Sequence, residues 1–183
     1  MERRGIIRIV STYEGIFKIE NWADAFFQLM DDVYWENPIY LFDLDGTIAG
    51  ISHRLHFIQN DNKDWDSFFK ACVNDKPISN IVHLLNDLKN HTNCRIWIVS
   101  GRSSMIARET VDWLRDNNVP YDWLFMRAKE DHRPDYVLKE LWLKKIPTYI
   151  QEKIVCVFED RQSVVDMWRE NGITCCQVAK GNF

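Results

Sequence analysis

Two aspartates follow a short apolar run in this sequence. The run Ile39–Phe42 leads directly into Asp43 and Asp45, and Gly46 and Thr47 come next. Alternate side chains of an extended chain point to the same side, so we expect the two carboxylates to converge if the strand continues through them. Two acids so close repel each other unless a cation neutralises them. The pattern therefore predicts a cation beside this pair, with Gly46 permitting a turn and Thr47 offering a hydroxyl.

A third acid, Asp160, follows another apolar run far along the chain. A few hard oxygen ligands, with room for water and a phosphate oxygen, are typical of a Mg²⁺ site. The five histidines show no zinc-ligand spacing, which argues against zinc. Asp43, Asp45 and Asp160 are therefore the predicted metal residues.

Phosphoryl transfer is the chemistry that suits these residues. One carboxylate can act as a nucleophile and form an aspartyl-phosphate, while a second acts as general acid and base. Hydroxyls and cations must then hold the charge of the transferred group, and Thr47, Ser100 and Lys139 suit that task by type. The simpler interpretation is that D-x-D-G only ends a strand in a turn. It becomes less favoured because more polar strand ends follow downstream.

The elements that must position these residues alternate in the manner of an α/β fold. From residue 38 onward, short apolar runs alternate with helical patterns, which predicts a parallel sheet with right-handed crossovers. The expected strands are Ile39–Phe42, Ile96–Val99, Trp123–Met126, Ile154–Phe158 and Thr174–Val178, and the expected helices are Ile78–Lys89, Met105–Asn117, Tyr136–Lys145 and Ser163–Asn171.

Such sheets bind ligands at the carboxyl ends of their strands. Beyond the first aspartates, the polar residues that follow the expected strands are Ser100-Gly101-Arg102, Arg127 and Glu159-Asp160-Arg161. Four separate strand ends thus bring carboxylates, hydroxyls and arginines to one edge of the sheet.

Residues 1–37 lack the alternation of strands and helices that begins at residue 38, and we expect them to form an N-terminal extension of the domain 38–183. Gly5–Val10 and Gly15–Ile19 alternate like a hairpin, and Trp22–Tyr34 has helical spacing. We expect this hairpin and helix to pack on the main core. A role in binding a protein partner or in self-association is the alternative.

Composition limits the class of protein. With 183 residues, 46% hydrophobic and 27% charged, the chain suits a single globular domain, and no apolar run approaches the roughly 18 residues of a membrane span. Five scattered cysteines without a C-x-x-C pair predict reduced thiols in a cytoplasmic protein. A net charge of −4 argues against a general nucleic-acid coat.

Several segments together resemble the haloacid dehalogenase (HAD) superfamily of phosphotransferases, and within it the 3′-phosphatase domain of bacteriophage polynucleotide kinase/phosphatase. The resemblance covers about residues 38–183 and does not extend to residues 1–37. The segments that carry it are Leu41-Phe42-Asp43-Leu44-Asp45-Gly46-Thr47-Ile48-Ala49, Val99-Ser100-Gly101-Arg102, Arg133-Pro134-Asp135-x-x-x-Lys139-Glu140, Glu159-Asp160-Arg161 and Gln177-Val178-Ala179-x-Gly181-x-Phe183.

The resemblance implies a HAD-type, Rossmann-like sheet with helices on both faces and these roles. Asp43 would be the phosphorylated nucleophile and Asp45 the general acid/base. Mg²⁺ would be held by the Asp43 carboxylate, the Asp45 carbonyl and Asp160. Ser100 and Lys139 would bind the phosphoryl group with help from Thr47, and the other residues matched around the substrate are Arg54, Gly101, Arg102, Arg127 and Asp135. Glu159 stands where the family often has aspartate, which leaves its part in the metal site open.

The spacing between motifs bears on the substrate. Only 56 residues separate Asp43 from Ser100 and 38 separate Ser100 from Lys139, so a minimal cap or none is expected. An open site can admit the end of a long chain. Flanking phosphates would need cations, and those projected to that edge as a basic rim are Arg54, Arg102, Arg127, Lys129, Arg133, Arg161 and Lys180.

The prediction is a Mg²⁺-dependent phosphatase that removes the 3′-phosphate from DNA or RNA ends. A mononucleotide or small-metabolite phosphatase of the HAD type is one alternative, and a non-catalytic HAD-fold binding module is another. The chain has no G-x-x-x-x-G-K-[ST] motif for a kinase.

Two further residues have open roles. His53 could contact the substrate or only lie on the surface. Trp65 is the tryptophan best placed to stack a base, because those at 97, 113, 142 and 168 fit the core.

Overall fold

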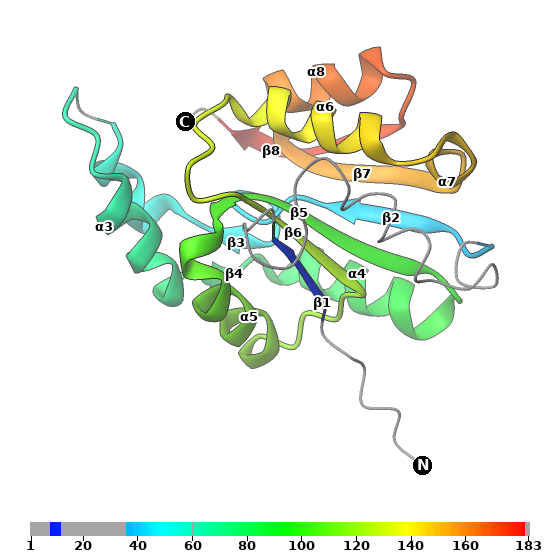
Figure 1. The fold of residues 1–183 in the computed structure, drawn as a ribbon. Coiled ribbons are helices and arrows are strands. Elements are labelled where there is room, and N and C mark those ends of the chain that lie inside the picture. The colour runs from blue at the N-terminus through cyan, green and yellow to red at the C-terminus, as the bar shows by residue number, and fades with distance from the viewer. Residues whose placement is uncertain (1–7, 12–35, 60, 182–183) are drawn as a thin grey trace.

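A computed structural model describes residues 8–11, 36–59 and 61–181, and its centre is a six-stranded, fully parallel sheet (Figure 1). The strand order is β1-β6-β5-β2-β7-β8. Every strand and helix expected after residue 38 is present within a few residues of its expected bounds, which confirms the α/β fold class. The strands are β1 Arg8–Ser11, β2 Ile39–Phe42, β5 Arg95–Ser103, β6 Trp123–Arg127, β7 Ile154–Arg161 and β8 Cys175–Gly181.

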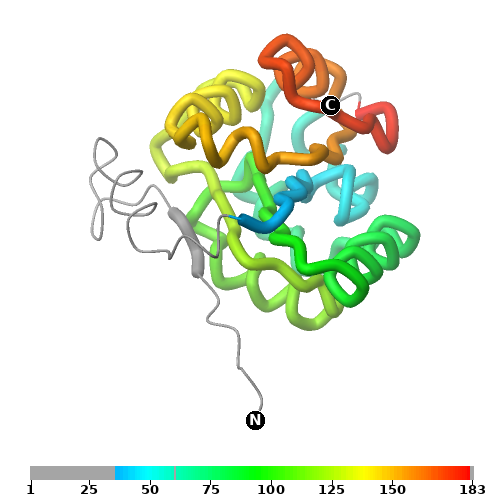
Figure 2. The backbone as a smooth tube through the Cα atoms, turned by 90° about the vertical axis from the view of Figure 1, so that its right-hand side faces the viewer, coloured from blue at the N-terminus to red at the C-terminus, as the bar shows by residue number. Residues whose placement is uncertain are grey.

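Helices cover both faces of the sheet (Figures 1 and 2). Alternating residues of β5 supply both cores: Ile96 and Ile98 pack with α4 and α5, while Trp97 and Val99 pack with α6 and α8. The helices are α4 Ser79–His91, α5 Ala107–Asp116, α6 Asp135–Lys145, the short α7 Thr148–Gln151 and α8 Gln162–Glu170. None of the helices in the described ranges has the length and apolar character needed to cross a membrane.

A small insertion, residues 51–75, separates the two strands of a short antiparallel pair, β3 Ala49–Gly50 and β4 Lys76–Pro77. It contains two 3₁₀ helices, Ser52–Phe57 and Ala71–Asn74, on either side of helix α3, Trp65–Lys70. Its apolar side chains form a separate small core around Ile51, Ile58 and Phe68. This insertion is the minimal cap expected from the spacing, and α3 projects from the end of the molecule toward which β8 runs (Figure 1).

The one described strand of the N-terminal segment, β1, pairs with the main sheet, although the sequence predicted that this part of the chain belongs to a hairpin. β1 pairs in parallel with β6, with Arg8 opposite Trp123, and so extends the main sheet. This addition covers the backbone groups that β6 would otherwise leave unpaired at the sheet edge. The expected partner strand Gly15–Ile19 and the helix Trp22–Tyr34 lie outside the described residues, and the domain boundary at residue 37 stays a prediction.

Candidate active site

The polar strand ends meet because their strands are neighbours. β2 lies between β5 and β7, all three parallel, so Asp43, Ser100 and Asp160 emerge at the same edge of the sheet. All three residues are buried. The sequence expectation that remote strand ends converge is therefore correct.

Three carboxylates form a compact cluster at this edge. One oxygen each from Asp43, Glu159 and Asp160 lies within 4.8 Å of the others. Burial, and next the charge of Glu159, raise the pKa of Asp43 well above its ordinary value. Burial, and next the charge of Asp43, raise the pKa of Asp160 to about 7. The cluster is therefore short of positive charge, and its hard carboxylate oxygens suit a Mg²⁺ ion.

Lys139 supplies part of the missing charge. Its Nζ lies 2.5 Å from Asp43 Oδ1, 2.8 Å from Glu159 Oε2 and 3.2 Å from Asp135 Oδ2. Burial alone would lower the pKa of Lys139, but the charges of Asp135, Asp43 and Glu159 outweigh it and raise the pKa. Lys139 is therefore a charged side chain held against the predicted nucleophile. Lys139 is fully buried, so its ion pair with Asp135 is part of the site and not a solvated surface pair.

Glu159 is occupied on both of its carboxylate oxygens. One accepts from Lys139, and the other accepts from the backbone N–H groups of Asp160 and Arg161 at 3.2 and 3.3 Å. The longer side chain thus braces Lys139 and the backbone at Asp160. Its place as a metal ligand stays a prediction.

The carboxylate of Asp45 points to a different set of partners, and this corrects the expectation that it converges with Asp43. β2 ends at Phe42, so the alternation of an extended strand does not continue through the two aspartates. Asp45 Oδ1 instead accepts from Arg102 Nε and Nη2 at 2.8 and 2.6 Å and from Arg54 Nη2 at 2.7 Å. Burial opposes its ionisation, but the charges of Arg102 and Arg54 outweigh burial and lower the pKa of Asp45.

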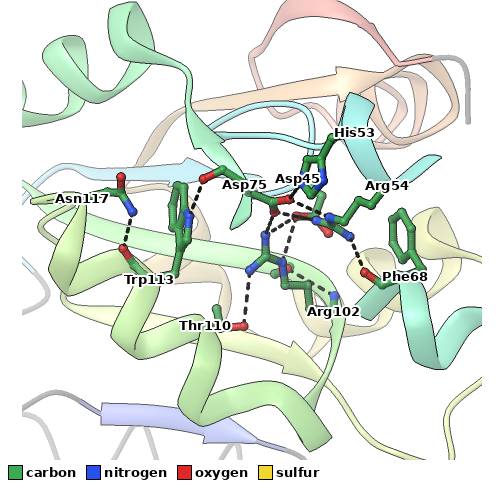
Figure 3. A network of polar contacts seen from close by, with 10 residues as sticks. Asp45, His53, Arg54, Phe68, Asp75, Arg102, Thr110, Trp113 and Asn117 are labelled. Carbon is green, nitrogen blue, oxygen red and sulfur yellow. Dashed lines mark hydrogen bonds and ion pairs between the residues drawn. The ribbon is translucent and has the colours of Figure 1, made fainter. Parts of the chain in front are cut away.

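Asp75 completes this network and was missed by the sequence analysis (Figure 3). Its carboxylate accepts from Arg54 Nε and Nη2 at 2.7 Å each, and from Arg102 Nη2 at 2.6 Å. His53 Nε2 lies 2.8 Å from the same carboxylate, and Trp113 Nε1 donates to the Asp75 carbonyl at 2.8 Å. Asp75 therefore positions the two arginines that hold Asp45. In the sequence it is one polar residue in a polar stretch, and it carries no motif.

We expect Asp75→Ala to destabilise the fold by about 3–5 kcal/mol, because it leaves Arg54 and Arg102 buried with half of their negative partners removed. Urea unfolding followed by circular dichroism measures this change. The matched control is Asp61→Ala, at an exposed position of the same insertion, which should leave stability nearly unchanged. An equal, small effect of both substitutions would contradict the positioning role.

Two glycines leave the space that Asp160 occupies. A Cβ atom would lie 2.2 Å from Asp160 Oδ2 at Gly46 and 2.1 Å from it at Gly181. Gly46 also has a positive φ of 94°, which favours glycine. Gln177 Nε2 donates to the Asp160 carbonyl at 2.9 Å. The C-terminal segment that carried part of the resemblance thus helps to position a predicted metal residue.

We expect Gly181→Ala to displace the Asp160 carboxylate and to raise the Mg²⁺ concentration for half-saturation of the acid cluster by about 10- to 100-fold. Isothermal titration with Mg²⁺ measures it. Ala179→Ser adds one atom at an exposed position of the same strand and serves as the control. An unchanged Mg²⁺ requirement would show that Asp160 tolerates displacement or does not serve the metal.

The remaining predicted residues lie around the same edge. Thr47 is fully buried, and its Oγ1 has no hydrogen-bond partner in the described part of the chain, as suits a group that awaits a ligand. Ser100 Oγ accepts from the Arg102 N–H at 3.2 Å. A Cβ atom at Gly101 would lie 2.4 Å from Asp135 Oδ1, so this glycine allows Asp135 to approach.

The prediction that Arg54, Arg102 and Arg127 form part of an exposed basic rim is wrong, because their guanidinium groups face protein oxygens. Arg54 and Arg102 are buried and contact Asp45 and Asp75. Arg127 donates to the Gly101 and Arg133 carbonyls at 2.9 and 2.6 Å and to Asp135 at 3.2 Å. These cations form the inner structure of the site. The tryptophans assigned to the core, at 97, 113, 142 and 168, are indeed buried.

Comparison with known proteins agrees with this geometry. A family model described as the polynucleotide kinase PNKP phosphatase domain matches residues 37–183. A protein of Autographa californica nuclear polyhedrosis virus, named as a bifunctional polynucleotide kinase/RNA ligase, is 32% identical over 133 residues, which cover 71% of this chain and 17% of that protein.

Solved structures with the same fold include a chain of a Pnkp1/Rnl/Hen1 complex, with a TM-score of 0.64 and 28% identity over 80% of this chain and 48% of that one. A haloacid dehalogenase-like hydrolase of Streptococcus pneumoniae has a TM-score of 0.51 and 16% identity over 77% and 84% of the two chains, which shows the fold alone. The chain spans less than half of the viral relative and of the chain in the complex.

Proposed function

Because the chain belongs to the family of polynucleotide kinase PNKP phosphatase domains, we propose that this HAD-fold phosphatase removes the 3′-phosphate from DNA or RNA ends in a Mg²⁺-dependent reaction. The observation that carries the proposal is the division of labour between two aspartates. Asp43 lies with the acid cluster and Lys139, while Asp45, two residues later, is held separately by Arg54 and Arg102.

In the first step, an Asp43 carboxylate oxygen attacks phosphorus and the bond from phosphorus to the 3′ oxygen breaks. Lys139 stabilises negative charge on the transferred group, with Ser100 and Thr47 as hydroxyl donors. Asp45 gives its proton to the departing 3′ oxygen. In the second step, water attacks the aspartyl-phosphate, Asp45 takes a proton from that water, and inorganic phosphate leaves as the Asp43 carboxylate is restored.

The metal would be held by the Asp43 and Asp160 carboxylates and the Asp45 carbonyl, with Glu159 beside them. When bound, Mg²⁺ neutralises the acid cluster and draws charge from the phosphoryl oxygens. Burial, and next the neighbouring carboxylates, raise the pKa of Asp43 and of Asp160. A bound cation would offset both effects, which supports this assignment.

The position of Asp45 suits alternating proton transfers. Arg102 and Arg54 lower its pKa and so favour the base form needed for the second step. A bound phosphate brings negative charge and acts in the opposite direction, which favours the acid form before the first step. The network is therefore consistent with an Asp45 carboxyl that is protonated when the phosphorylated substrate is bound and ionised when water attacks the aspartyl-phosphate.

The substrate assignment rests on the family and on the small cap. The insertion at 51–75 has only 25 residues, too few for a large lid at this position, which agrees with a site that accepts a chain end. A protein partner for residues 1–37 and a cytoplasmic location stay predictions of the sequence.

One assay tests the proposal directly. Rates with Mg²⁺ are compared for the same oligonucleotide with a 3′-phosphate or a 5′-phosphate, for a nucleoside 3′-monophosphate and for an aryl phosphate. We expect the 3′-phosphorylated oligonucleotide to have the highest kcat/KM. Equal values for the oligonucleotide and the mononucleotide would favour the small-metabolite alternative. No Mg²⁺-dependent hydrolysis of any substrate would favour the non-catalytic binding module.

A further inference from the structure

The insertion presents an exposed tryptophan beside the candidate active site. Trp65, the first residue of α3, is 46% exposed although it is a large aromatic side chain. Its ring lies 5.8 Å from that of Phe68 and 5.9 Å from that of Phe69, and Lys63 Nζ lies 5.8 Å from its centroid. Neighbouring rings therefore fix the orientation of Trp65, while much of its surface stays open to a ligand.

This tryptophan is joined to the general acid/base through a short series of contacts. Figure 3 shows Arg54 next to Phe68. The Arg54 guanidinium carbon lies 4.2 Å from the centroid of the buried Phe68 ring, and Arg54 Nη2 donates to Asp45 at 2.7 Å. The Trp65 ring makes a T-shaped contact with the same phenylalanine. Two steps, of 5.8 and 4.2 Å, thus lead from the Trp65 ring to the cation that holds Asp45.

The direction of the leaving group points the same way. A general acid must reach the oxygen that departs, so the leaving nucleoside lies on the Asp45 side of the transferred phosphoryl group. In an in-line displacement the attacking Asp43 must lie opposite the leaving oxygen, and Lys139 contacts Asp43. The nucleoside therefore extends from Asp45 toward its other neighbours, which include the insertion.

The charges around Trp65 indicate which part of a nucleotide it can contact. Three acids, Asp61, Asp64 and Asp66, flank it in the sequence and outnumber the one basic residue there, Lys63, whose Nζ lies over the ring. Asp64 accepts from the Ser67 N–H at 2.9 Å as the cap of α3. Such an acidic neighbourhood disfavours phosphate. An aromatic ring can still stack on the uncharged face of a base, and every base offers such a face.

We propose that Trp65 is a stacking platform for the nucleobase whose 3′-phosphate is removed. This inference rests on the proposed function and adds a base-binding site to it. The platform would make the enzyme recognise a nucleotide end with little preference among bases.

Another exposed aromatic residue near the site is less well placed. Tyr136 is 43% exposed at the start of α6. It follows Asp135, which contacts Lys139 on the side of the transferred group. A base leaving toward Asp45 would lie away from Tyr136.

The experiment compares Trp65→Ala and Trp65→Phe on three substrates: a short single-stranded oligonucleotide with a 3′-phosphate, the same oligonucleotide with an abasic terminal nucleotide, and an aryl phosphate. We expect Trp65→Ala to raise KM about tenfold on the first substrate only, and Trp65→Phe to retain most of the affinity. Tyr149→Ala is the matched control, since Tyr149 is 53% exposed on α7, at the opposite end of the molecule (Figure 1).

Equal changes on all three substrates, or no change on the first, would overturn the platform. So would a similar loss with Tyr136→Ala and none with Trp65→Ala. Anisotropy of a labelled oligonucleotide that ends in a 3′-hydroxyl separates this inference from the proposed function. If wild-type protein hydrolyses only the aryl phosphate, the proposed function fails, whereas weaker oligonucleotide binding by Trp65→Ala would still support the platform and equal binding would refute it.

Discussion

Asp43→Asn is expected to reduce phosphatase activity by at least about 10⁴-fold on every substrate, because the amide cannot form the covalent bond to phosphorus. The change is nearly isosteric and removes a carboxylate that repels Glu159, so the fold should persist. Initial rates on an aryl phosphate and circular dichroism of the same preparation measure the two effects. Asp87→Asn, at an exposed position of α4, is the control and should keep full activity.

A second measurement makes this result specific to the nucleophile. Acid-quenched protein from a reaction with labelled phosphate ester should carry label in the wild type and none in Asp43→Asn. Label at another residue, or substantial turnover by Asp43→Asn, would show that the nucleophile is assigned to the wrong carboxylate.

Asp45→Asn is expected to lower kcat by about 10²–10⁴-fold while the affinity for Mg²⁺ stays within a few-fold of the wild type. The Asp45 carboxylate points to Arg54 and Arg102 and lies apart from the acid cluster, so its loss should not remove a metal ligand. Isothermal titration with Mg²⁺ and steady-state kinetics measure the two quantities.

The leaving group provides an internal control for Asp45→Asn. An aryl oxide departs with little help from an acid, whereas a nucleoside 3′ oxygen needs a proton. The defect in forming the phosphoenzyme should therefore be larger on the oligonucleotide than on the aryl phosphate. A Mg²⁺ affinity that falls together with kcat would show that the carboxylate itself binds the metal.

Much of this architecture is readable from the sequence because its signals are local. Apolar runs such as Ile39–Phe42 and Ile154–Phe158 are long enough to be recognised as buried parallel strands, and D-x-D-G-T marks the end of the first. The topology of a parallel sheet then brings Asp43 and Asp160 together without any knowledge of side-chain contacts.

What could not be predicted depends on pairs that are distant in the sequence. Asp75 contacts Arg54 and Arg102 across 21 and 27 residues, and no periodicity or motif relates them. The direction of the Asp45 carboxylate depends on a strand that ends one residue before Asp43, a boundary that periodicity does not fix to that accuracy. The pairing of β1 with β6 likewise depends on which sheet edge is open.

Because these arginines contact protein groups, the binding of oligonucleotides should depend only weakly on ionic strength. The guanidinium groups of Arg54, Arg102 and Arg127 donate to protein oxygens, so these three cations are less available to displace the counterions that surround a polynucleotide. The logarithm of oligonucleotide affinity should then fall with the logarithm of salt concentration with a slope of only about −1 to −2, as measured by anisotropy between low and physiological salt. Such a protein would not be retained along the interior of long strands, and its encounters with rare termini would be only weakly opposed by competition from intact backbone.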